Sequence, residues 1–281
     1  MPSATFVLSA FGDEIAPDPK EQLSFLRSLK IGYLELRGAW SKNVLQFDDN
    51  ETARVSRICK EHGIQVSCIG SPIGKTPIVA PIEQEIGNLD RAFKIADGVN
   101  TRSIRIFSFY PPDTTSNIRY DEYVAQATER LARLTRAAEN EGFDLLLENE
   151  KEIVGDTPER CYTILRAVNS PRLRFTWDPA NFVQVGVGNT TDRGWPTLGK
   201  YVAYVHVKDA LLGSGAVKPA GEGDGQVKKL LSHLRDNGYR GFLSLEPHLA
   251  GGPESMAQAA AALRKLLAEL DCSESEALGI A

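Results

Sequence analysis

Four short apolar runs in the second half of the chain each end in an acidic or imidazole side chain. The polar residues at these ends are Glu148, Asp178, His206 and Glu246, in the segments DLLLENE, LRFTWDPAN, YVAYVHVKD and GFLSLEPH. Each run has the length and composition of a buried strand, and 28 to 40 residues separate consecutive polar ends. This spacing leaves room for one helix and two loops. The pattern therefore predicts a β/α unit that is repeated along the chain.

The first half of the chain continues the alternation of strand and helix. Apolar segments at residues 5–9, 33–37, 64–69 and 103–109 bring the number of expected strands to eight. Asp18 can cap a helix with Pro19 at its first position, and Gly142 is expected to end a long amphipathic helix. The helices are expected from about Asp18, over 48–63, 82–96 and 121–141, and from about 157, 191, 226 and 253.

The domain organisation follows from this count. A chain of 281 residues fits one barrel of about 250 residues, and no linker interrupts the alternation. We therefore expect an α/β protein with a single (β/α)₈ TIM barrel over residues 1–270. Residues 271–281 lack clear periodicity and are expected to form a loosely held C-terminal tail.

Composition argues against several classes of partner. A net charge of −5 and a pI of about 5.5 disfavour nucleic-acid binding through bulk electrostatics. No segment resembles a signal peptide, and no apolar run is long enough to span a membrane. The four cysteines show no CxxC pairing, which is typical of reduced core thiols. We expect a cytoplasmic protein with a small-molecule partner and neither a nucleic-acid nor a membrane partner, and assembly into a homo-oligomer stays open.

The four polar strand ends predict a metal site. The C-terminal ends of the strands of a parallel barrel meet at one mouth, so Glu148, Asp178, His206 and Glu246 would converge there. Three clustered carboxylates repel one another, and a divalent cation removes that repulsion. Three carboxylates and one imidazole without a thiolate suit Mn²⁺, Mg²⁺ or Co²⁺ better than a structural zinc site. We expect one divalent ion, with Mn²⁺ as the first choice.

Several segments are similar to a known family in their order and spacing. They are SAFGDEI, YLELRG, IGSPIGK, IRIFSFY, LLLENE, WDPANF, YVHVKDA, GEGDG and FLSLEPHL. Over roughly residues 5–250 they resemble the xylose-isomerase-like TIM barrels described as sugar phosphate isomerases/epimerases. The resemblance implies a (β/α)₈ barrel whose metal is held by a Glu, an Asp, a His and a Glu. In the keto-sugar epimerases of this superfamily the two ligand glutamates exchange the α-proton of the sugar, and Glu148 and Glu246 match them.

Other polar residues near the expected mouth are candidates for substrate binding. Lys208 projects to the same side as His206 and is expected to hold a substrate oxygen, unless it is an exposed lysine paired with Asp209. Asn181 stands where the epimerases often have a histidine, which argues against a simple keto-hexose 3-epimerase. For the three rim residues Arg37, Lys75 and Arg105, a salt bridge is the alternative role. The other candidates for substrate contact are His248 and Glu150.

Four functional classes remain open from the sequence. An isomerase or epimerase that works through a metal-stabilised enediolate is favoured, and a metal-dependent lyase acting on 3-oxo-glycosides needs the same proton abstraction. A nuclease like endonuclease IV needs several metals and many histidines, whereas this chain has four histidines. A non-catalytic binding barrel is the fourth class. Glu222 and Asp224 in the GEGDG loop would repel a phosphate dianion, which favours free or glycosidically linked sugars.

Overall fold

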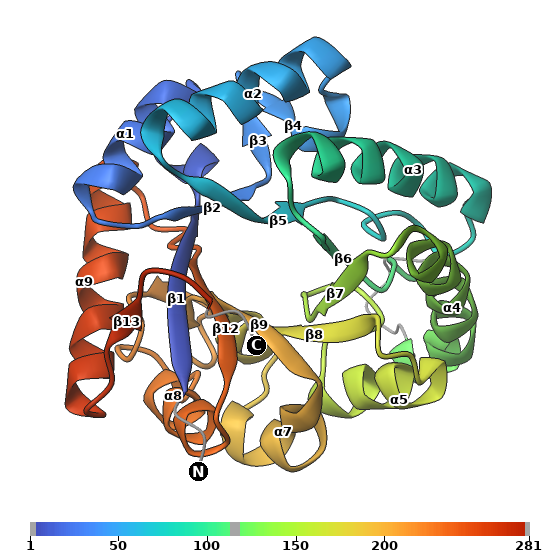
Figure 1. Cartoon of the computed structure of the whole chain (residues 1–281). Coiled ribbons are helices and arrows are strands. Elements are labelled where there is room, and N and C mark those ends of the chain that lie inside the picture. The colour runs from blue at the N-terminus through green and yellow to red at the C-terminus, as the bar shows by residue number, and fades with distance from the viewer. Residues whose placement is uncertain (1–3, 113–118, 279–281) are drawn as a thin grey trace.

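The computed structural model describes residues 4–112 and 119–278, and it contains a closed barrel of eight parallel strands (Figure 1). The strands follow one another around the barrel in chain order, and β12 pairs with β1 to close it. This arrangement confirms the predicted (β/α)₈ fold and all eight predicted strands. The barrel strands are β1 (Thr5–Phe11), β2 (Tyr33–Leu36), β5 (Gln65–Gly70), β6 (Ser103–Ile106), β7 (Asp144–Glu148), β8 (Leu173–Trp177), β9 (Val202–Val207) and β12 (Arg240–Leu245).

Helices form a ring outside the strands (Figure 1). The α-helices are α1 (Pro19–Ser28), α2 (Asp49–His62), α3 (Ile82–Val99), α4 (Val124–Glu141), α5 (Pro158–Val168), α6 (Pro179–Gln184), α7 (Thr190–Leu198), α8 (Val227–Asp236) and α9 (Pro253–Glu269). Short 3₁₀ turns are η1 (Gly12–Glu14), η2 (Val44–Gln46), η3 (Tyr120–Tyr123) and η4 (Gly199–Tyr201). No helix among the described residues is long and apolar enough to cross a membrane.

Local signals in the sequence account for the ends of several helices. The Asp18 side chain accepts a hydrogen bond from the Lys20 amide and begins α1, as predicted. Asp48 and Glu51 form a reciprocal capping box at the start of α2. Gly63 and Gly142 end α2 and α4 with positive φ angles of 62° and 76°, a conformation that costs glycine little. Chain-local chemistry thus sets the length of these elements.

The apolar core lies mainly between the outer faces of the strands and the helices. Inside the barrel the composition differs, because polar side chains occupy several inward positions. Ser9, Glu35, Thr176, His206 and Ser244 are all fully buried there, on β1, β2, β8, β9 and β12. Burial of polar groups is costly unless they are paired. The interior of the barrel is therefore built to hold a polar site as well as to pack.

Three features were not predicted from the sequence. Helix α6 begins directly after β8, and two short hairpins follow β2 and β9. Two residues of the expected loose tail form β13 (Glu274–Ser275), which pairs with Phe6 and Val7 of β1. This corrects the prediction for that part of the tail, since β2 pairs only with the far end of β1 and leaves these residues free to pair. The hairpins consist of β3 (Gly38–Ala39) with β4 (Lys42–Asn43), and β10 (Asp209–Ala210) with β11 (Val217–Lys218).

Candidate metal centre

Four side chains from consecutive strands meet at the C-terminal end of the barrel, which we call the mouth. Glu148 ends β7, Asp178 follows β8, His206 lies one residue before the end of β9, and Glu246 follows β12. All four are buried, and each offers one ligand atom within 4.8 Å of the others. Parallel strands in one barrel bring their C-terminal residues together in this way. The structure thus brings together the four residues that the sequence singled out.

Two atoms of this group lack a satisfying hydrogen bond. His206 Nδ1 lies 3.0 Å from Glu148 Oε1 and 3.6 Å from Glu246 Oε2, yet neither contact is well aligned. Asp178 Oδ2 lies 2.8 Å from the Lys208 ammonium, again without good hydrogen-bond geometry. Buried polar atoms in folded proteins are normally paired. An oxygen and a nitrogen left without an aligned partner between three carboxylates therefore fit a bound divalent cation.

The opposite side of the His206 ring is held by a carboxylate that sequence reasoning missed. His206 Nε2 lies 3.1 and 3.2 Å from the two oxygens of Glu35, which is fully buried on β2. A signal was present, because Glu35 interrupts the apolar strand YLEL at the position that alternates inward with Arg37. Burial lowers the pKa of His206, but Glu148 and Glu35 outweigh it and place that pKa well above its usual value.

Lys208 is a buried cation beside two of the four residues. Its Nζ lies 2.8 Å from Asp178 Oδ2 and 3.0 Å from Glu246 Oε2, and the residue is 3% exposed. The alternative of an exposed lysine paired with Asp209 is therefore wrong. Burial, with a smaller contribution from Glu246, raises the pKa of Asp178 to about 6 against the lowering effect of Lys208.

Asp209 instead anchors the glycine-rich loop over residues 221–225. Its carboxylate accepts hydrogen bonds from the backbone amides of Gly221, Gly223 and Gly225 at 2.8 to 3.1 Å. A side chain at Gly223 would lie 2.5 Å from Ala210 O and from Asp209 Oδ1, so this position has no room for a Cβ. The loop is thereby held against β10, the short strand that follows the His206 strand β9.

Glu148 is surrounded by donors. Arg105 Nη1 donates to its Oε2 at 2.7 Å, and Asn181 Nδ2 donates to its Oε1 at 3.3 Å. Burial raises the pKa of Glu148, but His206 and Arg105 outweigh this and lower it to about 2. Arg105 and Asn181 thus contact a carboxylate of the metal group, and Arg105 also has the salt bridge considered from the sequence.

Glu246 is held by a second set of cations. Arg37 Nη1 lies 2.9 Å from its Oε1, and His248 Nε2 lies 3.3 Å from the same oxygen. Arg37 and His248 both reach Glu14 as well, at 3.2 and 3.1 Å. Burial raises the pKa of Glu246, yet Lys208 and His248 hold it well below its usual range. Burial lowers the pKa of His248, but Glu14 and Glu246 raise it to about 9.

Lys75 and Glu150 lie farther out and form an ion pair with each other at 2.9 Å. The Lys75 ammonium lies 4.3 Å from the centre of the Phe107 ring, and the Arg105 guanidinium lies 4.5 Å from the same centre. Phe11 similarly lies under Arg37, at 4.3 Å. These aromatic rings orient cations whose long side chains would otherwise be mobile.

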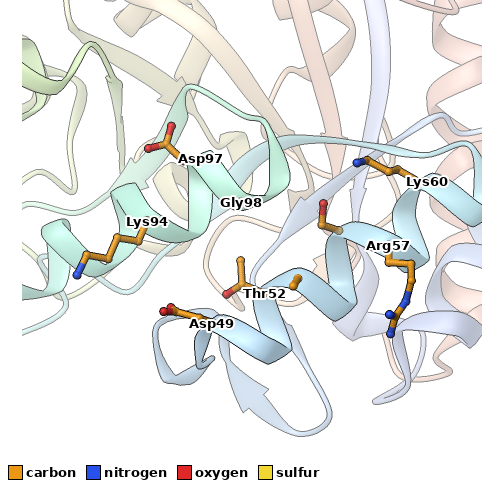
Figure 2. A pocket seen from close by; sticks show the side chains of 9 residues that line it. Asp49, Thr52, Arg57, Lys60, Lys94, Asp97 and Gly98 are labelled. Carbon is orange, nitrogen blue, oxygen red and sulfur yellow. The ribbon is translucent and has the colours of Figure 1, made fainter.

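One cavity lies near this centre and another lies far from it. One of about 380 Å³ lies beside Arg37 and is lined by Asp13 and by the β3–β4 hairpin. The other, of about 680 Å³, is a groove on the outer surface between α2 and α3 (Figure 2). In the groove the close approach of the helices depends on Gly98, where a Cβ would meet Thr52 Cγ2 at 2.6 Å. This groove is lined by none of the four residues Glu148, Asp178, His206 and Glu246, so it is unrelated to the centre.

The remaining histidines and Trp177 lie away from the four ligand atoms. His62 is in α2 and His233 is in α8, where it stacks on Trp195 with the ring centres 5.0 Å apart. Trp177 is fully buried and packs edge-to-face on Phe182. It serves packing, because neighbouring residues of a strand point to opposite faces and Trp177 directly precedes the inward-facing Asp178.

Comparisons with known proteins identify relatives of this barrel. The sequence matches the family described as xylose isomerase-like TIM barrel over residues 23–266. No curated protein matches the sequence.

Three solved structures illustrate the likeness. A D-tagatose 3-epimerase-like protein is 16% identical with a TM-score of 0.73, and the match covers 95% of this chain and 98% of that one. The probable 3-DHS dehydratase AsbF of Bacillus anthracis, involved in petrobactin synthesis, is 16% identical with a TM-score of 0.73, over 92% and 98% of the two chains. The IOLI protein with a zinc atom is 17% identical with a TM-score of 0.73, over 95% and 99%. At these identities the likeness establishes the shared fold.

Proposed function

The chain belongs to the xylose isomerase-like TIM barrel family, and from this premise we propose that it is a divalent-metal-dependent isomerase or epimerase of a sugar or sugar derivative. The observation that carries the proposal is the convergence of Glu148, Asp178, His206 and Glu246 at the barrel mouth, with ligand atoms within 4.8 Å of one another. The unaligned Nδ1 of His206 and Oδ2 of Asp178 support a cation at this place.

The same four residues would hold the cation. Three carboxylate oxygens and one imidazole nitrogen form a hard donor set, which suits Mn²⁺ first and Mg²⁺ or Co²⁺ as alternatives. When bound, the cation supplies positive charge that stabilises the negative charge developing on a substrate carbonyl oxygen as the neighbouring carbon loses its proton. A site that holds such a cation therefore favours reactions that begin with removal of a proton next to a carbonyl group.

Glu148 and Glu246 are proposed as the acid/base pair. They come from β7 and β12, which are separated by β8 and β9 in the barrel, so they approach the centre from different sides. Both carboxylates are held ionised, Glu148 beside Arg105 and Glu246 beside Lys208, so each can accept a proton. One ionised glutamate removes the α-proton and later passes it to solvent, while the other takes up a proton from water and gives it to the opposite face of the substrate. Lys208 and His248 are proposed to orient the substrate oxygens.

The charge pattern at the mouth favours an uncharged substrate. Among the described residues, the four long cations near the centre are already paired with carboxylates: Arg37 with Asp13, Glu14 and Glu246, Lys75 with Glu150, Arg105 with Glu148, and Lys208 with Asp178 and Glu246. A phosphate group needs cations that are free to pair with it. A free or glycosidically linked sugar fits better, because its hydroxyl groups can join these pairs without adding charge.

One observation favours a second candidate, a lyase acting on 3-oxo-glycosides. His248 has a pKa raised to about 9 beside Glu14 and Glu246, so it carries a proton at neutral pH. It is 40% exposed at the rim, where a departing group would leave. In such a reaction a glutamate takes the α-proton, the C–O bond to the aglycone breaks, and His248 gives its proton to the departing oxygen.

The two candidates are tested with the same variants. The purified protein is loaded with Mn²⁺ and incubated in D₂O with a panel of keto-sugars and 3-oxo-glycosides, and NMR follows α-proton exchange and product formation. Exchange with a change of configuration or carbonyl position indicates an isomerase or epimerase, and release of an aglycone indicates the lyase.

Glutamine variants then test the base. Glu148→Gln and Glu246→Gln keep an oxygen ligand but lose the proton acceptor, so exchange is expected to fall by about 100-fold or more while bound metal stays near one per chain. If both variants exchange at the wild-type rate, these glutamates serve as ligands only, and Glu150 is the next candidate for the base. A wild-type protein that binds no divalent cation would overturn the proposal itself.

A further inference from the structure

Glu35 lies on the side of His206 that faces away from the metal group. It is fully buried on β2, and both of its oxygens lie within 3.2 Å of His206 Nε2. The two residues are 171 positions apart in the sequence. Among the described residues, His206 is the hydrogen-bond partner of the Glu35 carboxylate, so this buried acid is directed at one imidazole nitrogen.

The neighbouring rings determine the plane of the imidazole but leave its proton undetermined. Phe11 meets the His206 ring edge-on with centroids 5.1 Å apart, and Tyr204 meets it nearly perpendicularly at 5.8 Å. Such packing restricts rotation of the ring. It does not select which nitrogen carries hydrogen.

The carboxylate makes that selection. An ionised carboxylate only accepts hydrogen bonds, so the nitrogen that faces Glu35 must be N–H. The other nitrogen also faces a carboxylate, Glu148, at 3.0 Å, so in the metal-free protein it carries hydrogen as well. A cation that binds the ring must displace that second hydrogen, and the other nitrogen then supplies its lone pair. That nitrogen is Nδ1, which points between Glu148 Oε1 and Glu246 Oε2. Nδ1 is thereby the nitrogen that faces the place where the cation is proposed to bind, while Glu35 keeps the hydrogen on Nε2.

We propose that Glu35 is the positioning residue of the metal centre: it holds the proton of His206 on Nε2 so that Nδ1 is free to bind the cation. The inference rests on the metal site of the proposed function. Carboxylates that orient a metal-binding histidine also make the ring more basic, and their loss commonly weakens metal affinity about 10- to 100-fold. In the described hydrogen bonds and ion pairs Glu35 contacts His206 and neither Lys208 nor His248, so its effect passes through His206.

Calorimetric titration with Mn²⁺ alone tests this inference without any substrate. Glu35→Leu removes the acceptor at similar size, and its Kd for Mn²⁺ is expected to rise about 10- to 100-fold. Glu35→Gln keeps a neutral acceptor oxygen, which binds the Nε2 hydrogen less strongly than a carboxylate, and its Kd is expected to rise about fivefold or more. Zn²⁺-loaded protein with ¹⁵N-labelled histidine provides a second readout, since the wild type should show an Nε2-protonated, Nδ1-bound ring.

A matched control distinguishes positioning from general damage to the barrel. Glu85 is also a buried carboxylate, 1% exposed, and it accepts a hydrogen bond from the Gly74 amide away from the four ligand residues. Glu85→Gln should leave the Kd for Mn²⁺ within about twofold of the wild type, because additivity holds for sites without shared partners.

The outcomes separate the two proposals. If the wild type binds no Mn²⁺, the proposed function fails. If the wild type binds Mn²⁺ and both folded Glu35 variants bind it equally well, the role of Glu35 is refuted. If Glu35→Leu does not fold, as judged by circular dichroism, a wild-type Kd in Glu35→Gln refutes it instead.

Discussion

Replacing Lys208 with methionine offers a quantitative test of how charge is balanced in the centre. The Lys208 ammonium is 3% exposed and lies 2.8 Å from Asp178 and 3.0 Å from Glu246. Methionine keeps the length of the side chain but removes the charge. Removing one partner of a buried ion pair typically costs about 3–5 kcal/mol, since the other charge is left uncompensated. In metal-free protein, Lys208→Met should lower the free energy of unfolding by about that amount.

A divalent cation should reverse part of this loss. The cation is proposed to lie between the same carboxylates, so it replaces the positive charge that the variant lacks. If it restores about half of the loss, roughly 2 kcal/mol, the variant should bind Mn²⁺ about 30-fold more tightly than the wild type. The loss of stability and the gain in affinity are two sides of one thermodynamic cycle. Substrate turnover should still fall, because Lys208 is also proposed to orient a substrate oxygen.

Lys75→Met is the matched control. Lys75 forms a similar pair with Glu150 at 2.9 Å, but its side chain is 33% exposed. Exposed ion pairs contribute about 0–1 kcal/mol. Urea unfolding followed by circular dichroism, in EDTA and in saturating Mn²⁺, compares the variants. The reasoning is refuted if Lys208→Met in EDTA is no less stable than Lys75→Met, or if it binds Mn²⁺ more weakly than the wild type.

Three further predictions follow from the same contacts. Metal should stabilise the native protein, by about 2.7 kcal/mol when free Mn²⁺ is 100 times its Kd, so EDTA should lower the Tm in differential scanning fluorimetry, and an unchanged Tm in protein shown to exchange metal would contradict the site. Burial raises the pKa of metal-free Asp178 to about 6. Because protons compete with the cation for this carboxylate, the Mn²⁺ affinity measured by calorimetry should fall as pH drops through 6. A flat affinity profile from pH 5 to 8 would exclude Asp178 as a ligand. Asp209→Ala leaves three backbone amides of the 221–225 loop without their acceptor, which should cost about 3 kcal/mol of unfolding free energy and speed amide exchange in that loop, while unchanged exchange would show that Asp209 does not hold it.

The sequence alone predicted the barrel and the convergence of Glu148, Asp178, His206 and Glu246. Apolar runs separated by helix-length segments form parallel strands when crossover helices cover them, so the alternation predicts a parallel α/β fold, and the count of eight strands together with the family resemblance selects the (β/α)₈ barrel. A residue at or just after the C-terminal end of such a strand lies near the mouth, and strand alternation decides whether its side chain points into the barrel. Glu148, Asp178, His206 and Glu246 could therefore be placed together from their positions in four consecutive units.

The tertiary structure alone decided which side chains pair across the barrel. Glu35 and His206 are 171 residues apart, and Arg37 and Glu246 are 209 apart, so no local pattern links them. The sequence left two roles open for Lys208, an exposed ion pair with Asp209 or a contact within the site. The pairing of β13 with β1 likewise depended on an unpaired stretch of β1 that strand propensity does not reveal. The physical reason is that periodicity and capping act between residues a few positions apart. The partner of a buried charge is set instead by the closure of the barrel, which brings side chains from distant strands within hydrogen-bonding distance.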